Sequence, residues 1–514
     1  MDDFSAVLMF ILLALFFILL GQSMYRKSQG KAKLPPSPPG LPIIGHFHLL
    51  GPLPHRAFHD ISQRHGPLLH LSFGSKSCVL VSSPEIAREC LKTNDASFLN
   101  HPRKTNLAYV TYDGADIFMA PYGPFWKFMR KLFITRLLSP TTLHHHSPVR
   151  AQELNFFLHC LLKKADLGEE VNVGEEVALL AYNIVTTMAF RKRCADVKSE
   201  GSQLIQVVKE LVELGGKFNL ADMGWLFKKL DLQGYRKLLK SVRSKYDVII
   251  ERIIKEHEES RRKKKDMQKD DEAEAEGDLL DILLDIYEDP NSEIRLTREN
   301  IKAFFLNIFG AGTDTSSLTV TWALAELMNH PDIMKKAKKE IDSVVGKGRL
   351  VEESDIPNLP YVESIVKETF RLHPTGTIIS RQATQECKVN GYVIPAKTSL
   401  IVNVWSIGRD PEYWEYPLEF RPERFMTDEG RSEMSLKAQN FELLVFGAGR
   451  RMCPGVSLAT KVVPTALAAM IQCFEWKLAH EGEVDMEEKP GLGLPRANPL
   501  LCIAVPRSLP FLKL

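Results

Sequence analysis

The most informative run in this chain is Phe446-Gly447-Ala448-Gly449-Arg450-Arg451-Met452-Cys453-Pro454-Gly455. Its glycines allow the backbone to turn tightly and to approach the sulfur of Cys453, so that peptide N–H groups can stabilise a thiolate. Phe446 can shield that sulfur, and Arg451 can reach a carboxylate of a bound porphyrin. The run is therefore typical of a loop that presents one cysteine, Cys453, to a haem iron as its axial ligand.

Two other interpretations of this run compete with haem binding. A lone cysteine is more often a small buried hydrophobic residue than a ligand. We interpret the other cysteines in that way: Cys78, Cys90, Cys160, Cys194, Cys387, Cys473 and Cys502. Gly447-x-Gly449 could also begin a dinucleotide-binding fingerprint, but Met452 stands where the third glycine is required. The cysteines lack paired or zinc-type spacing, which fits a reducing compartment.

Length and composition indicate one large folded body. The chain has 514 residues, of which 44% are hydrophobic and 25% are charged, and its net charge is +2. It can bury a sizeable core, and its charge gives no reason to expect a nucleic-acid partner. No glycine- or serine-rich linker divides it, so we expect residues 46–514 to form one catalytic domain.

Periodicity predicts a mainly α fold with a minor β portion. Short strand-like runs bounded by turn residues cover 68–73, 78–81, 388–394 and 399–404. Helical periodicity covers 124–137, 202–214, 235–262, 298–328 and 331–345. The charged run 261–265 and the acidic residues 270–278 are expected to form a solvated loop.

The N-terminal segment predicts a membrane anchor. From Phe4 to Leu20 only Ser5 is polar, and as a helix this run is about 26 Å long, close to the hydrocarbon core of the endoplasmic reticulum. A cleaved signal peptide would begin with basic residues, whereas Asp2 and Asp3 open this chain. Basic residues follow the apolar run and place that side in the cytosol. We therefore expect a single-pass anchor at 1–24, a stiff basic and proline-rich hinge at 25–45, and a cytosolic catalytic domain.

A second chemical element lies in the middle of the predicted 298–328 helix: Gly310-Ala311-Gly312-Thr313-Asp314-Thr315-Ser316. Glycines and hydroxyl groups weaken and bend the helix, which leaves space for water and dioxygen beside it. Thr315 would hold dioxygen and its water, and Asp314 would bring protons from solvent. The competing interpretation is a small-residue patch that serves only close helix packing.

Other motifs complete a resemblance to a known family. Glu368 and Arg371 are three residues apart and share a helix face, and Phe420-Arg421-Pro422-Glu423-Arg424-Phe425 follows about fifty residues later, before the cysteine loop. The chain resembles the cytochrome P-450 superfamily, whose signature Phe-x-x-Gly-x-Arg-x-Cys-x-Gly is matched at every fixed position. Asp314 and Thr315, the acid–alcohol pair, match the oxygen-activation motif of this family as well. The order of the motifs along the chain agrees with the family from residue 34 to the C-terminus. By this resemblance Glu368, Arg371 and Arg424 lock the core around the haem.

The resemblance implies a set of site residues and partners. Haem b would be bound by Trp126, Arg130, Arg381, Phe446, Arg451 and Cys453, with Cys453 as the iron ligand and Asp314 and Thr315 as the catalytic residues. The chain carries no nucleotide or flavin motif, so electrons would come from an NADPH-cytochrome reductase in the same membrane. Lys127 and Lys131 would point away from the haem and could form the basic patch on which that reductase docks.

The resemblance also implies a reaction and a substrate class. One oxygen atom of O2 would enter a small hydrophobic substrate. The chain most resembles plant members that oxidise flavonoids, isoflavonoids and pterocarpans, through 402–405, 484–489 and 494–497 among other segments. Ser380 stands where the isoflavone-forming branch is expected to carry lysine, and Thr375-Gly376-Thr377 replaces the common Pro-x-Pro. The pocket would be lined from 107–118, 305–315, 375–380 and 492–494.

Three alternatives stay open. Related plant enzymes hydroxylate triterpenoids. A haem-thiolate isomerase or dehydratase would share the Cys453 loop but usually lacks the acid–alcohol pair of Asp314 and Thr315. A haem-free membrane scaffold is the most distant alternative.

Overall fold

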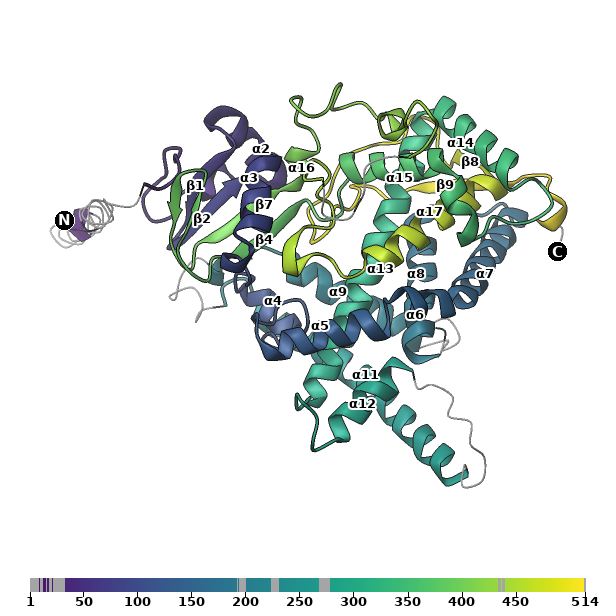
Figure 1. The fold of residues 1–514 in the computed structure, drawn as a ribbon, viewed down its shortest axis with the longest axis horizontal. Helices are drawn as coiled ribbons and strands as arrows, with labels where there is room; N and C mark the ends of the chain where they lie inside the picture. The colour runs from purple at the N-terminus through teal and green to yellow at the C-terminus, as the bar shows by residue number, and fades with distance from the viewer. Residues whose placement is uncertain are drawn as a thin grey trace, which may run out of the picture.

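The computed structural model describes residues 33–191, 193, 200–222, 231–267, 278–432, 436 and 440–512, together with a few isolated positions before residue 22. Helices dominate, and a smaller β region lies at one side of the helical body (Figure 1). The predicted fold class is thereby confirmed. The predicted anchor, the first part of the predicted hinge and most of the acidic run at 270–278 lie outside the described residues.

Each predicted helical stretch is a helix, and further helices complete the fold. The helices are α2 (Pro54–His65), α3 (Pro84–Arg88), α4 (Thr105–Val110), α5 (Pro124–Arg136), α6 (Pro140–His145), α7 (Ser147–Asp166), α8 (Val173–Phe190), α9 (Glu200–Gly216), α11 (Tyr235–Met267), α12 (Leu279–Glu288), α13 (Arg298–Asn329), α14 (Pro331–Val344), α15 (Pro360–Leu372), α16 (Val404–Ile407) and α17 (Val456–Cys473). The strands are β1 (Leu68–Phe73), β2 (Lys76–Val81), β3 (Val171–Asn172), β4 (Ile378–Gln382), β5 (Cys387–Val389), β6 (Tyr392–Ile394), β7 (Ser399–Asn403), β8 (Phe474–Leu478) and β9 (Leu501–Pro506).

The main sheet joins residues 68–81 to residues 378–403. Its order is β1-β2-β7-β4, in which β2 and β7 are parallel and the other neighbours are antiparallel. Val79 of β2 lies opposite Leu400 of β7, and both are buried. A smaller sheet, β3-β9-β8, lies among the helices. The main sheet thus places the N-terminal part of the domain beside the segment that leads to the cysteine loop.

The strand predicted at 388–394 is wrong in one respect. The run is a hairpin of β5 and β6 rather than a single strand. Asn390 and Gly391 take φ values of 47° and 76° between the two strands. An Asn-Gly pair with positive φ at both positions is the preferred type I′ turn, and this turn reverses the chain.

Helix α13 passes through the middle of the helical body (Figure 1). Thr297 caps its N-terminus in a capping box with Asn300, and α8, α15 and α17 pack around it. The helix is continuous through 310–316, so the expected weakening does not interrupt it. In the part of the chain that the structure describes, α17 is the one helix apolar and long enough to span a membrane, but it is mostly buried inside the domain and serves as a core helix.

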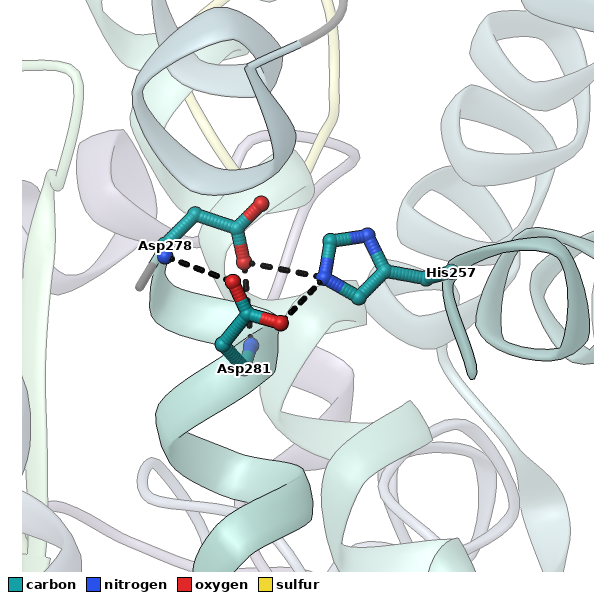
Figure 2. A group of neighbouring side chains, drawn as sticks. All are labelled: His257, Asp278 and Asp281. Atoms are coloured by element: carbon teal, nitrogen blue, oxygen red, sulfur yellow. Dashed lines mark hydrogen bonds and ion pairs between the residues drawn. The ribbon is translucent and has the colours of Figure 1, made fainter. Parts of the chain in front are cut away.

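Helix α11 extends to Met267, so the charged run 261–265 is helical and the prediction of a loop there is wrong. The side chain of Arg261 pairs with Asp281 and Asp285 of α12. His257, one turn earlier, lies 2.8 Å from Asp281 and 3.3 Å from Asp278 (Figure 2). Asp278 is the N-cap of α12 and forms a capping box with Asp281. His257 therefore ties α11 to the N-terminus of α12.

The triad expected from the sequence forms in the core. The side chains of Glu368 and Arg371 are fully buried, and their bidentate pair has N–O distances of 2.7 and 2.8 Å. Arg424 donates to the same carboxylate at 3.0 Å. The remaining N–H groups of Arg371 donate to three backbone carbonyls, those of Gly408, Pro417 and Glu419. All five donors of Arg371 are thus satisfied.

We expect Glu368→Ala to destabilise the domain by about 3–5 kcal/mol, because it leaves a buried guanidinium without its counter-charge. Urea unfolding followed by tryptophan fluorescence measures the change. Glu363→Ala on the same helix is the matched control, and it should cost less than about 1 kcal/mol because Glu363 is only partly buried. Equal effects of the two substitutions would contradict the role of the triad.

We also expect the α11–α12 junction to weaken as pH rises. Burial alone would lower the pKa of His257, but the hydrogen bonds and negative charges of Asp278 and Asp281 outweigh it and raise the pKa. A raised pKa means that the contact stabilises the fold below the ordinary histidine range and is lost as pH rises through the raised value. Amide hydrogen exchange in the first turn of α12 should therefore speed up with pH beyond its intrinsic dependence. His257→Gln should abolish this extra dependence, and its persistence would refute the assignment.

Candidate active site

The cysteine loop is a tight turn ahead of α17. The N–H of Cys453 donates to the carbonyl of Phe446 at 2.9 Å. Gly447 and Gly449 have φ values of 70° and 72°, a region that L side chains rarely adopt. At Gly449 a Cβ would also lie 2.5 Å from the carbonyl oxygen of Leu91. Only glycine allows the loop to approach the neighbouring chain so closely.

Cys453 combines an exposed side chain with a deep position in the fold. The residue is exposed, yet burial raises the pKa of its thiol. We infer that the sulfur borders an internal hollow rather than bulk solvent. The backbone N–H of Gly455 and the charge of Arg130 act in the opposite direction on this pKa and favour the thiolate.

Three arginines from different elements gather beside this loop. Arg130 of α5 donates to the carbonyl of Met452 at 2.6 Å, and Arg381 of β4 donates to the carbonyl of Arg451 at 3.1 Å. Arg451 donates to the carbonyls of Leu99, Phe118 and Ala120. Among the described residues, no carboxylate forms a salt bridge with any of the three.

The electrostatics of this cluster fit an anionic ligand. Burial lowers the pKa of Arg381 and of Arg451 to about 10. Repulsion from Arg130 lowers the pKa of both residues further, and Arg381 lowers that of Arg451. Asp95 acts in the opposite direction on Arg381, and Asp116 does so on Arg451, but neither carboxylate forms a salt bridge with these two arginines. Clustered buried cations are costly. The two carboxylates of a haem would offset this repulsion, and the adjacent thiol is a suitable iron ligand, so the residues present fit the group.

Trp126 uses its indole N–H within the protein. Its Nε1 donates to the carbonyl of Ile117 at 3.0 Å, whereas the sequence suggested a donor to a haem carboxylate. The guanidinium carbon of Arg451 lies 4.3 Å from the centroid of the indole ring, and that of Arg130 lies 5.4 Å from it. Such contacts are cation–π interactions. Trp126 therefore orients the two arginines in this structure.

One face of α13 presents Thr315, and Asp314 lies beside it on the neighbouring face. Asn307, Ala311 and Thr315 are spaced four residues apart and share a face. Ala311 and Thr315 are exposed although the helix crosses the core. The hydroxyl of Thr315 donates back to the carbonyl of Ala311 at 2.7 Å, which leaves its oxygen free to accept a hydrogen bond. Burial raises the pKa of Asp314 to about 6, although Lys209 of α9 acts to lower it.

The end of the expected pocket lining at 107–118 links α13 to the cysteine loop, a contact that sequence reasoning did not predict. The N–H of Phe118 donates to Asn307 at 3.2 Å, and its carbonyl accepts from Arg451 at 3.3 Å. Asp116 nearby is buried, and burial raises its pKa to about 6 despite hydrogen bonds from Asn307 and the N–H of Met119. The one available signal was an acid within an otherwise apolar run at 115–120, since acids are seldom buried without partners.

Comparisons with known proteins agree with this geometry. The family model described as "Cytochrome P450" matches residues 35–503. A "3,9-dihydroxypterocarpan 6A-monooxygenase" of Glycine max is 48% identical, covering 96% of this chain and 97% of that protein. A "2-hydroxyisoflavanone synthase" of Glycyrrhiza echinata is 41% identical, covering 97% of both chains.

Two further similarities agree with these. A "Beta-amyrin 24-hydroxylase" of Glycine max is 42% identical over 98% of both chains. The solved structure of a zebra fish cytochrome P450 with abiraterone superposes with a TM-score of 0.74 at 25% identity, covering 89% of this chain and 100% of that one. With the thiol, the arginine cluster and the acid–alcohol face already in place, these matches lead to one conclusion: the chain belongs to the cytochrome P450 family of haem-thiolate monooxygenases.

Proposed function

We propose that this protein is a membrane-anchored monooxygenase that oxidises a flavonoid, isoflavonoid or pterocarpan. The observation that carries the proposal is the thiol of Cys453, which borders an internal hollow beside Arg130, Arg381 and Arg451, three arginines that form no salt bridge with a described carboxylate. When bound there, haem supplies the activation of O2 and the insertion of one oxygen atom into a C–H bond.

The protein residues have separate tasks around the haem. Cys453 holds the iron, with the N–H of Gly455 stabilising its charge. Arg130, Arg381 and Arg451 bind the haem carboxylates. Phe446 covers the sulfur side, where its ring packs edge-to-face on Phe370 at 5.3 Å.

Proton delivery falls to the pair on α13. The oxygen of Thr315 accepts a hydrogen bond from a water in the hollow and holds that water where it can donate a proton toward the reacting oxygen. Asp314, with a pKa of about 6, can bind and release a proton near neutral pH. The presence of both Asp314 and Thr315 argues against the function of an isomerase or dehydratase, because such reactions require no proton relay to O2.

The cellular setting follows from the N-terminal sequence and from α5. The apolar run from Phe4 to Leu20 supports a single-pass anchor in the endoplasmic reticulum with a cytosolic catalytic domain. Lys127 and Lys131 are exposed on α5, the helix whose buried residues include Trp126. They support docking of an NADPH-cytochrome reductase, which is the source of electrons.

The substrate class rests on the relatives. A pterocarpan monooxygenase and an isoflavanone synthase are similar over nearly the whole chain, and Ser380 favours hydroxylation over aryl migration. The β-amyrin hydroxylase supports a second candidate, a triterpenoid substrate. Microsomes supplied with a plant reductase and NADPH should oxidise a flavanone or a pterocarpan faster than β-amyrin, measured by mass spectrometry of the products. Oxidation of β-amyrin alone would establish the second candidate.

We expect Cys453→Ala to remove the red-shifted Soret band of the reduced carbon monoxide complex, because that band requires a thiolate ligand. The measurement is a difference spectrum of the purified protein. Cys160→Ala is the control, since Cys160 is a free cysteine in another part of the fold. A red-shifted band that survives Cys453→Ala would assign the ligand to a different residue.

Thr315→Ala should retain haem but lower the product formed per NADPH by roughly 10- to 100-fold, because a positioned proton donor is lost. Product and NADPH consumption are measured in the same reaction. Thr321→Ala is the matched control, since the Thr321 hydroxyl bonds back to Ser317 in the same way but lies almost two turns further along α13. Unchanged coupling in Thr315→Ala would remove Thr315 from the relay.

A further inference from the structure

A hairpin near the C-terminus packs against α13 and α9. Glu488 and Arg496 form a β-bridge. The N–H of Lys489 donates to the carbonyl of Pro495 at 2.9 Å, and the N–H of Ala497 donates to the carbonyl of Glu487 at 2.8 Å. Residues 487–489 and 495–497 are therefore the two arms, and residues 490–494 are the tip.

The tip of this hairpin packs closely on the elements that surround the hollow. At Gly493 a Cβ would lie 2.9 Å from the side chain of Leu318, which is three residues beyond Thr315 on α13. At Gly216, the last residue of α9, a Cβ would lie 2.9 Å from the backbone of Leu492. Leu492 is 47% exposed despite these neighbours. The carbonyl of Leu494 accepts a hydrogen bond from Trp322 of α13 at 2.7 Å.

The first arm is held by a buried carboxylate. Glu488 accepts hydrogen bonds from His55 at 2.9 Å and Arg56 at 2.6 Å on α2, and from the indole N–H of Trp405 on α16 at 2.8 Å. Only 2% of its side chain is exposed. Its donors come from residues more than 400 and more than 80 positions away.

The charge state of this carboxylate is well defined. Burial by itself would raise the pKa of Glu488, but the hydrogen bonds from His55, Trp405 and Arg56 outweigh it and lower the pKa to about 2. An ionised carboxylate can only accept, so Nε2 of His55 carries a proton. The two carboxylate oxygens thus accept from three donors. A glutamine amide cannot reproduce this arrangement, because its NH2 group would face at least one N–H donor.

The second arm is held from the other side. The guanidinium of Arg496 lies 5.1 Å from the centre of the Trp322 ring and donates to the carbonyl of Asp485. The opposite face of Trp322 is covered by His373, with ring centroids 4.1 Å apart and nearly parallel planes. Trp322 also bonds the tip through Leu494, so this arm is fixed to α13.

We propose that Glu488 is a positioning residue, which clamps the hairpin to α2 and α16 and so fixes Leu492 and its neighbours where the substrate binds. This inference rests on the proposed monooxygenase function, because the tip can select among C–H bonds only in a protein that oxidises a substrate. Loss of the clamp lets the tip move, and the substrate then presents other positions for oxidation. Glu488 itself touches neither substrate nor haem.

The test compares Glu488→Gln with Glu487→Gln. The two changes are chemically identical, but Glu487 is exposed. In Glu488→Gln we expect faster hydrogen exchange in residues 490–494 and an unchanged carbon monoxide spectrum. The ratio of oxidation products and the amount of product per NADPH should each change on the order of tenfold, because the substrate is held less precisely. Glu487→Gln should match the wild type in all four measurements.

A second probe separates this inference from the proposed function. Clotrimazole, a bulky azole, and imidazole are titrated into the protein and followed in the Soret region. Glu488→Gln should change the ratio of their dissociation constants by about tenfold, because only the bulky ligand reaches the tip. This result requires no turnover, so a wild type that oxidises none of the substrates would refute the proposed function alone.

The inference is overturned if hydrogen exchange, product ratio and azole ratio in Glu488→Gln all equal those of the wild type. It is also overturned if exchange at 490–494 rises while both ratios stay the same, because the clamp would then be structural only.

Should Glu488→Gln fail to bind haem, Trp405→Phe removes one of the three donors and leaves the carboxylate in place. The same shifts, smaller in size, are expected for Trp405→Phe, and their absence would refute the role of the clamp.

Discussion

Glu368 accepts four hydrogen bonds where water cannot reach, two from Arg371, one from Arg424 and one from the N–H of Arg421. A buried carboxylate and a buried guanidinium are tolerated only when each has all its partners. Arg371 meets this condition by donating to carbonyls between residues 408 and 419. The irregular segment after α16 is thereby held against α15 without regular secondary structure of its own.

Helix α15 also contacts the loop that carries Cys453. Phe370, beside Arg371, packs its ring edge-to-face on Phe446, and the carbonyl of Phe446 accepts the N–H of Cys453. Displacement of α15 would therefore be transmitted to the sulfur through two direct contacts. Arg130, Arg381 and Arg451, which also contact this part of the structure, repel one another, and an anionic ligand would offset that repulsion. The contacts of α15 and the positive charge of these arginines therefore both favour haem binding at the loop.

Glu488 resembles Glu368 in how it is used. Each is a buried carboxylate that accepts hydrogen bonds from residues more than fifty positions away, and each holds a segment outside the named helices and strands. The difference lies in what is fixed. Glu368 supports the side of the iron ligand, whereas Glu488 supports the hairpin that packs against α13 near Thr315.

The sequence by itself determined the features that depend on local spacing. The cysteine loop, the pair of Asp314 and Thr315, the Glu368–Arg371 pair and the long helices follow from residues within one or two turns of each other, and such patterns can be recognised without knowledge of the fold. Only the tertiary structure decided which partners the buried polar groups find and which apolar helix lies in the core. Trp126 donates its N–H to the carbonyl of Ile117, Glu488 accepts from His55 across more than 400 residues, and the apolar helix α17 is mostly buried. A buried polar group must pair with whatever the fold brings to it, and that neighbour cannot be identified from position in the chain.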